Sequence, residues 1–191
     1  MPRLLSVEDW TRLHLEAQSA MQRRRQVLPT VYIGMGTCGI AAGAGEIETA
    51  LRRELDERRL QAEVVAVGCI GMCFKEPLVD IQLPGHPRVT YANVKPDMIP
   101  RLVEEHLTQG KILEKAALGQ LRTADSENTP LTGLPEYSQL PFYRKQVRVA
   151  LRNCGIINPE DIKEYIALEG YRALAKALYE MSPDEVIEEV K

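Results

Sequence analysis

Residues Pro29 to Gly45 read PTVYIGMGTCGIAAGAG, and this stretch decides the fold. A short β-rich run leads into a glycine-rich loop, and apolar residues then recur every fourth position, which predicts an amphipathic helix over about 44–58. A second buried strand, AEVVAVG, follows this helix and ends at Gly68. The stretch therefore opens a β-α-β unit, whose two strands we expect to be parallel and joined by a right-handed crossover.

The residues that follow predict a β-hairpin and a further helix. LVDIQLP and RVTYANV are two strand-like runs joined by the turn Pro84-Gly85. A second amphipathic helix starts near Pro96 and ends at Gly110, while a helix capped by Ser6 precedes all of the strands. We therefore predict an α/β fold. It would be a thioredoxin-like mixed sheet, β-α-β then β-β-α, with an N-terminal helix, a linker and a small helical tail.

Composition divides the chain into four parts. Residues 1–28 read as the N-terminal helix and residues 29–110 as the thioredoxin-like domain. Residues 111–141 are polar and hold three prolines, which predicts an extended linker lying on a partner or on the domain itself. Residues 142–191 read as small amphipathic helices that bury little apolar surface alone. The last helix reaches Lys191 without a C-cap, so we expect the natural polypeptide to continue.

Charge and hydropathy exclude several classes of partner. The formal net charge of the 191 residues is −3 at pH 7, which provides no basic field for nucleic acid. No apolar run approaches the length of a membrane span, and the first ten residues lack the hydrophobic core of a signal peptide. We therefore expect a cytoplasmic protein with no nucleic-acid partner and no membrane span.

The chain has four cysteines, Cys38, Cys69, Cys73 and Cys154. In a reducing compartment, metal or redox use is a better explanation of such residues than a disulfide framework. Cys38 follows the first predicted strand, and Cys69 and Cys73 follow the second with C-x3-C spacing. Both loops leave a parallel β-α-β unit at the same sheet edge, so we expect these three thiols to converge. Cys154 is better explained as a buried structural cysteine.

Three kinds of chemistry fit converging thiols beside glycines. Iron–sulfur ligation fits best, because these clusters take cysteine thiolates and backbone N–H groups can point at the sulfur atoms. Structural zinc more often uses C-x2-C pairs, and redox dithiols more often use Cys-x-x-Cys. A dinucleotide site is the weaker interpretation of Gly34, Gly36 and Gly39, since the second strand ends in Gly68-Cys69 and not in an acidic residue.

At these residues the sequence resembles a known family. The segments VYIGMGTCGIAAGA and GCIGMC, with the β-β-α ending, look like the thioredoxin-like [2Fe-2S] ferredoxin domain at the start of NADH-binding flavin subunits. The segments from PFYRKQVRVALRNCG to MSPDEVIEEVK look like the opening of the flavin subunit proper. Such subunits belong to complex-I-like dehydrogenases, bidirectional and bifurcating hydrogenases and NAD-dependent formate dehydrogenases. The resemblance implies electron transfer and docking to other subunits of such a complex.

The first cysteine loop departs from the pattern of this family. The family has C-x4-C before the helix. Here Gly34 occupies the position of the first cysteine and Gly39 the position of the second, while Cys38 lies one residue before that second position. The resemblance thus implies a [2Fe-2S] cluster on Cys38, Cys69 and Cys73, three of the four expected thiols, with the fourth ligand unknown.

The fourth ligand and the other cofactors have weaker sequence signals. Cys154, His86 and His106 are weak candidates for the fourth ligand, because one lies beyond the linker, one in a turn and one on a helix. The chain ends before the glycine-rich segment in which such subunits bind FMN and NADH, so both are expected only outside this chain. By itself the chain is not expected to be catalytic.

Two further hypotheses remain open beside electron transfer. The domain could keep the fold without a cluster and act as an assembly module for a multi-subunit complex. Alternatively, Cys69 and Cys73 could act as a thiol redox pair, for which Lys75 is the one nearby basic residue.

Overall fold

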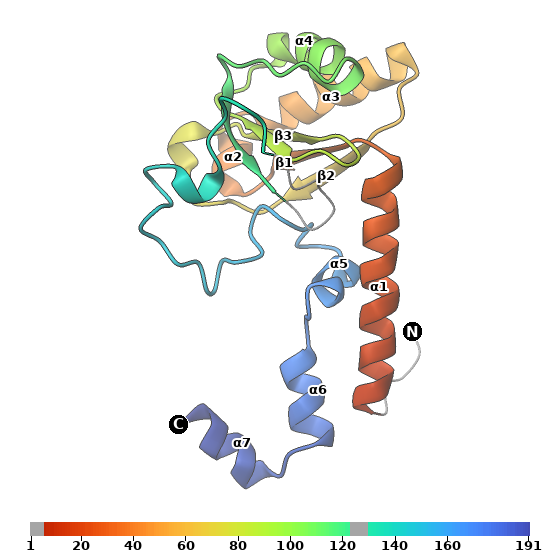
Figure 1. Ribbon diagram of the computed structural model, residues 1–191, viewed down its shortest axis with the longest axis vertical. Coiled ribbons are helices and arrows are strands. Elements are labelled where there is room, and N and C mark those ends of the chain that lie inside the picture. Colours follow the sequence, from red (N-terminus) through yellow and green to blue (C-terminus); the bar gives the residue numbers. More distant parts are fainter. Residues whose placement is uncertain (1–5, 123–129) are drawn as a thin grey trace. The chain divides into compact units, whose positions relative to one another are not determined.

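The computed structural model describes residues 6–122 and 130–191 (Figure 1). Contacts divide the chain into two compact units, Met1–Arg23 with Glu160–Lys191 and Arg24–Pro159. In chain order the elements are α1 (Val7–Val27), β1 (Thr30–Gly34), α2 (Thr37–Ala41), α3 (Ala44–Arg58), β2 (Glu63–Val67), η1 (Cys73–Lys75), β3 (Val79–Gln82), β4 (Arg88–Tyr91), η2 (Pro96–Met98), α4 (Ile99–Arg101), the π-helical η3 (Leu102–Thr108), β5 (Ala117–Leu121), η4 (Tyr137–Gln139), α5 (Ile162–Ala167), α6 (Arg172–Tyr179) and α7 (Pro183–Val190).

One mixed sheet organises the larger unit. Its strand order is β2-β1-β3-β4-β5. Strands β1 and β2 are parallel, with Tyr32 opposite Val65, and the other neighbours are antiparallel. The hairpin between β3 and β4 turns at Gly85, whose φ of +77° favours glycine. The predicted order of β-α-β followed by a β-hairpin and a helix is therefore confirmed.

The fifth strand lies where the sequence predicts a linker. Residues 117–121 pair antiparallel with β4 and so continue the sheet beyond the hairpin. Their sequence, ALGQL, is poor in the β-branched and aromatic residues that mark strands, which explains why the pattern does not predict β5. The Gln120 side chain is buried and holds the following segment, because its Nε2 donates to the Leu131 carbonyl at 2.9 Å.

The main core lies between one face of the sheet and the helices α3, α4 and η3. Figure 1 shows α3 and α4 on the same side of the strands. Strand residues such as Val31 and Val89 and helix residues such as Ile47 are 0% exposed. This burial agrees with apolar residues that alternate along the strands and recur at every fourth position of the helix. The other core members are Ile33, Ala44, Ala50, Leu51, Leu55, Val79, Ile81, Tyr91, Val94, Ile99, Leu102, Val103, Leu107 and Leu113.

A histidine is buried at the edge of this core. His106 is 4% exposed, and its Nδ1 lies 2.8 Å from the Tyr91 hydroxyl. Burial, followed by repulsion from His86, lowers the pKa of His106 to about 4. The folded protein therefore keeps this imidazole neutral at pH values where an unfolded chain would charge it.

This burial predicts a loss of stability in acid. Below about pH 6.5 the imidazole of residue 106 is protonated in the unfolded chain. In the folded chain it stays neutral until the pH falls to about 4. The free energy of unfolding should therefore fall by about 3 kcal/mol across this window, at about 1.4 kcal/mol per pH unit. Urea unfolding at several pH values measures it. His106→Gln should remove most of this slope, whereas His86→Gln at the exposed turn should keep most of it, because burial is the larger cause of the lowered pKa. An unchanged slope in His106→Gln would refute the assignment.

The opposite face of the sheet carries a buried polar layer. Arg88 is 2% exposed, and its Nε donates to Asp80 Oδ2 at 2.6 Å. The Arg88 guanidinium also stacks 3.6 Å from the centre of the Tyr32 ring. Residues from the end of the predicted linker cover part of this layer, since the Tyr137 hydroxyl hydrogen-bonds Thr90. The described residues 130–141 of the predicted linker therefore lie on the domain itself.

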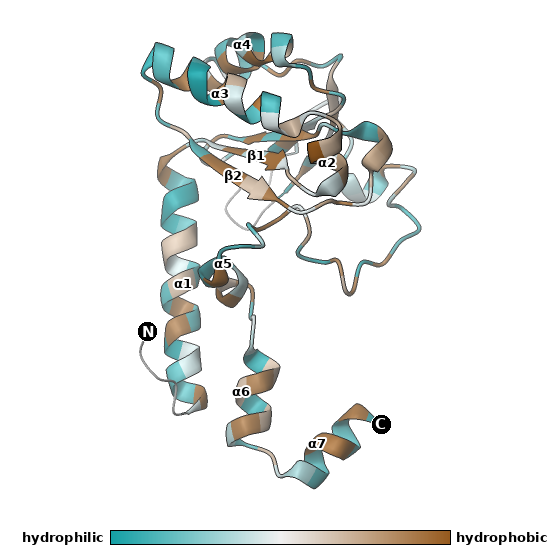
Figure 2. Ribbon diagram, turned by 180° about the vertical axis from the view of Figure 1, so that it is seen from behind, coloured by the Kyte–Doolittle hydropathy of each residue, from teal (hydrophilic) through white to brown (hydrophobic). Residues whose placement is uncertain are grey.

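The smaller unit combines most of α1, as far as Arg23, with α5, α6 and α7. Trp10 is buried, and its indole Nε1 donates to the Gly170 carbonyl at 3.0 Å. Helix α7 begins with a capping box between Ser182 and Glu185. Figure 2 shows hydrophobic bands on α6 and α7. Within the described residues, no helix combines the length and apolar character that crossing a membrane requires.

Candidate metal centre

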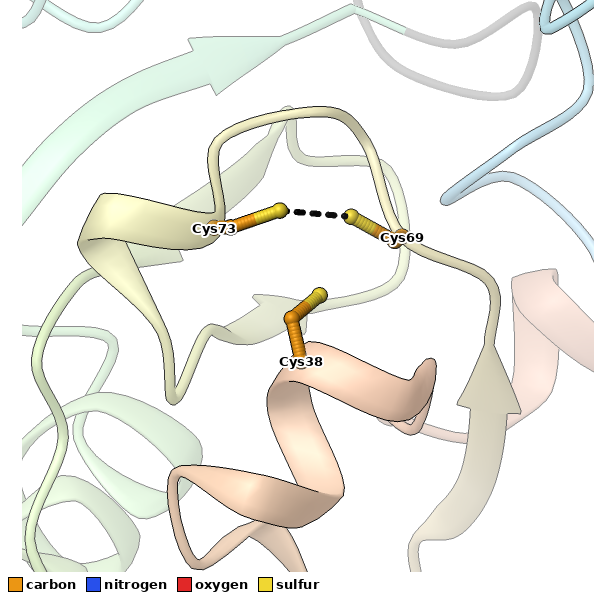
Figure 3. Close-up of side chains that lie close together, drawn as sticks. All are labelled: Cys38, Cys69 and Cys73. Carbon is orange, nitrogen blue, oxygen red and sulfur yellow. Dashed lines mark hydrogen bonds between the residues drawn. The ribbon is translucent and has the colours of Figure 1, made fainter.

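Three cysteines meet beside the end of β1 and β2. The Sγ atoms of Cys38, Cys69 and Cys73 all lie within 4.8 Å of one another. Figure 3 shows the Cys38 side chain pointing from its helix toward the other two, which face each other. The Cys69 and Cys73 Sγ atoms are 3.7 Å apart, and all three residues are free thiols. The predicted convergence is therefore confirmed, and it follows from the parallel β-α-β connection.

Glycines allow the two cysteine loops to approach each other. A Cβ atom on Gly36 would lie 2.9 Å from the Cβ of Cys69. A Cβ atom on Gly39 would lie 2.0 Å from the Gly34 carbonyl oxygen, so the short helix α2 packs directly on the end of β1. Cys38 lies in the first turn of α2, where the sequence predicts only a loop. Close packing thus accounts for glycines that also match a dinucleotide motif.

The loop from Cys69 to Cys73 is held by its own backbone and by the segment that follows the linker. Gly71 has a φ of +90°, which lets the chain turn between the two cysteines. The Gly71 N–H donates to Cys69 Sγ at 3.3 Å, a contact that stabilises a thiolate. The Tyr143 hydroxyl donates to the Ile70 carbonyl at 2.7 Å and fixes the loop from the other side.

A buried carboxylate completes the surroundings of the thiols. Glu76 is 8% exposed, and its Oε1 lies 3.9 Å from Cys38 Sγ. Burial raises the pKa of Glu76 above its ordinary value. The pKa of Cys38 is raised to about 12, first because Cys69 hydrogen-bonds its thiol and then because of burial. Cys38 therefore lacks the depressed pKa of a catalytic nucleophile, and a metal ion binding there would displace its proton.

The weaker sequence candidates are not members of this group of thiols. Cys154 is not among the group of thiols that lie within 4.8 Å of one another in the described part of the chain. Its Sγ lies 4.0 Å from the point where a Cβ on Gly68 would be. His106 bonds Tyr91 in the core, and His86 is exposed in the hairpin turn. Sequence reasoning missed Glu76, because a glutamate three residues after Cys73 matches no ligand spacing.

The donor set fits an iron–sulfur cluster in kind. Two thiolates on one tetrahedral metal ion, at the bond length of about 2.3 Å that zinc thiolates have, lie about 3.8 Å apart. The separation of 3.7 Å between Cys69 and Cys73 matches such a pair. Soft sulfur donors, a backbone N–H aimed at one sulfur and partial burial are features of iron–sulfur sites.

Comparisons with known proteins find several relatives that are similar to this chain in sequence. No family model matches the chain. It is 58% identical over 48 residues to the NADP-reducing hydrogenase subunit HndC of Solidesulfovibrio fructosivorans, covering 25% of this chain and 10% of that one. It is 29% identical over 117 residues to subunit HndB of the same hydrogenase, covering 60% of this chain and 90% of HndB. The chain thus spans about a tenth of HndC and most of HndB.

Ferredoxins are a second group of relatives. The chain is 35% identical over 72 residues to a 2Fe-2S ferredoxin of Clostridium pasteurianum, covering 37% of this chain and 68% of the ferredoxin. Among solved structures, a thioredoxin-like [2Fe-2S] ferredoxin from Aquifex aeolicus superimposes with a TM-score of 0.44 and 20% identity. That superposition covers 50% of this chain and 94% of the ferredoxin.

Proposed function

Because this chain belongs to the thioredoxin-like [2Fe-2S] ferredoxin family, we propose that it transfers single electrons within a multi-subunit NAD(P)-linked oxidoreductase. The observation that carries the proposal is the meeting of three free thiols within 4.8 Å at one end of the sheet. A [2Fe-2S] cluster supplies a site that accepts and releases one electron at a time. Cys38, Cys69 and Cys73 would hold it, and the Gly71 N–H would stabilise the Cys69 thiolate.

The chain would also dock onto other subunits of the complex. Within the smaller unit, an apolar cavity of about 390 Å³ is lined by Trp10, Leu13, Ile162, Ile166 and Leu178 among others. Two leucines of α6 remain strongly exposed, Leu174 at 51% and Leu178 at 64%. Contiguous exposed apolar surface of this kind is typical of protein interfaces. The likeness to two subunits of an NADP-reducing hydrogenase supports other subunits of such an oxidoreductase complex as the partners.

The proposal also concerns the other cofactors of the complex and the compartment in which it works. FMN and NADH would be bound by other parts of the complex, and this domain would carry electrons to or from them. Free cysteines fit the reducing conditions of the cytoplasm, where we expect the complex to work.

Iron and sulfide analysis tests the proposal. Chain purified without oxygen, alone and with its partner subunits, should contain about two iron and two sulfide ions per chain. Dithionite reduction should bleach its visible absorption and produce an EPR signal from a cluster with one unpaired electron. The variant Cys69→Ser should lose most of the iron, whereas Cys154→Ser should keep it.

Two other results would redirect the assignment. A chain that stays bound to its partners but contains no iron in either preparation would remove electron transfer and leave the docking role. Tightly bound zinc, with no sulfide, would replace the cluster with a structural metal site.

A further inference from the structure

The three thiols leave one position of a two-iron cluster to be filled. Such clusters are held by four protein ligands, two on each iron. Cys69 and Cys73 face each other at 3.7 Å and form one natural pair. Cys38 stands alone on the opposite side of the site, on α2 (Figure 3). The missing donor should therefore lie next to Cys38.

The Glu76 carboxylate is the side chain found there. Its Oε1 lies 3.9 Å from Cys38 Sγ. Two ligands of one tetrahedral ion, one oxygen and one sulfur at zinc-like bond lengths, would lie about 3.5 Å apart. The second pair is thus within a few tenths of an ångström of the separation that a shared metal ion requires.

The structure also holds this carboxylate in place. Glu76 Oε2 accepts the Leu78 N–H at 2.8 Å, which leaves Oε1 directed at Cys38. A hydrogen bond to the far oxygen is how proteins commonly orient a ligating carboxylate. Gly34 makes room for it, because a Cβ at that position would lie 2.9 Å from Oε2 and 3.1 Å from Oε1.

Burial gives a second reason to assign Glu76 a partner. Glu76 is 8% exposed, and the contacts described above are to one backbone N–H and one thiol. A buried carboxylate without a cationic partner is costly, and binding a metal ion is one of the few ways to compensate it. By contrast, the buried carboxylate of Glu54 is paired with Arg58 Nε at 3.0 Å.

We propose that Glu76 is the fourth protein ligand and binds the cluster iron through Oε1, beside Cys38. This inference rests on the proposed function, since it requires that the cluster is present. It makes the site a three-cysteine, one-carboxylate centre. Glutamate and cysteinate carry the same charge, so the total ligand charge equals that of a four-cysteine site.

Isosteric substitution of Glu76 tests the ligand directly. In Glu76→Gln the amide keeps the shape but is a poor iron ligand, so iron retained after a timed EDTA challenge should fall at least about tenfold. The EPR g values and visible spectrum of any remaining cluster should change as well. Glu54→Gln is the matched control, a buried carboxylate of α3, and should keep wild-type iron and spectra.

A ligand exchange provides the second variant. The double variant Gly34→Cys with Glu76→Ala removes the carboxylate and introduces a thiol at residue 34. A Cβ at residue 34 would lie 2.9 Å from the Oε2 of Glu76, so the new thiol lies close to the position of the carboxylate. Iron retention should return to within about twofold of wild type, with the stronger visible absorption of an additional thiolate.

The outcomes separate this inference from the proposed function. If the wild-type chain holds two irons and Glu76→Gln has the same iron content, g values and spectrum, then Glu76 is not a ligand. Electron transfer would remain the proposed function. Wild-type chain without iron would overturn both. If Glu76→Gln does not fold by circular dichroism, the double variant decides, and a folded double variant without iron would overturn the proposal.

Discussion

Replacing Arg88 with methionine should lower the free energy of unfolding by about 3–5 kcal/mol, because it leaves a buried carboxylate without its cation. Arg88 is 2% exposed on β4, and its Nε donates to Asp80 Oδ2 on β3 at 2.6 Å. Methionine preserves the apolar stem but removes the charge that Asp80 faces. It also removes the guanidinium that lies 3.6 Å from the centre of the Tyr32 ring. Urea unfolding at pH 7 measures the effect.

An exposed ion pair of similar geometry is the control for this prediction. Arg52 pairs with Glu48 at 2.7 Å on α3, but the two side chains are 56% and 30% exposed. Arg52→Met should therefore change the free energy of unfolding by about 0.5 kcal/mol or less. The double variant Asp80→Leu with Arg88→Met should be less destabilised than Arg88→Met, because it leaves no buried charge unpaired. A loss below about 1 kcal/mol in Arg88→Met would contradict the argument.

The features that followed from local patterns could be predicted. The helix at Ala44–Arg58 and the hairpin of β3 and β4 were both marked by periodicity and turn residues. The meeting of Cys38 with Cys69 and Cys73 could be predicted too, because it requires only that two loops leave a parallel unit at one edge. The strand topology alone is therefore enough to predict that these thiols meet, without any detail of side-chain packing.

The features that depend on tertiary packing could not be predicted. Strand β5 forms because the edge of β4 pairs with residues 117–121, whose own propensities do not favour a strand. Glu76 reaches the thiols from outside the C-x3-C pattern, since its place depends on the path of the chain after Cys73 and on the space beside Gly34. Neither arrangement has a period or spacing that a sequence pattern can detect.

The contact between α2 and the end of β1 leads to the second large effect. Gly39→Ala should destabilise the protein by about 3 kcal/mol or more, at the upper end of the cost of overpacking. The added Cβ would lie 2.0 Å from the Gly34 carbonyl oxygen and 2.9 Å from its carbon, so it meets backbone that cannot move aside like a side chain. Helix α2 must shift away from β1, and Cys38 shifts with it. The same variant should therefore lose most of its iron after the EDTA challenge.

Gly45→Ala is the matched control for this substitution. Gly45 lies in the first turn of α3, and a Cβ there would meet nothing within 4 Å. Alanine should therefore stabilise the protein by about 0.5–1 kcal/mol, the helix preference of alanine over glycine, and leave its iron content unchanged. Urea unfolding and iron analysis of both variants give the comparison. If Gly39→Ala were as stable as the wild type and held the same iron, α2 would not be packed against β1 as described, and the position of Cys38 beside the other two thiols would lose its structural basis.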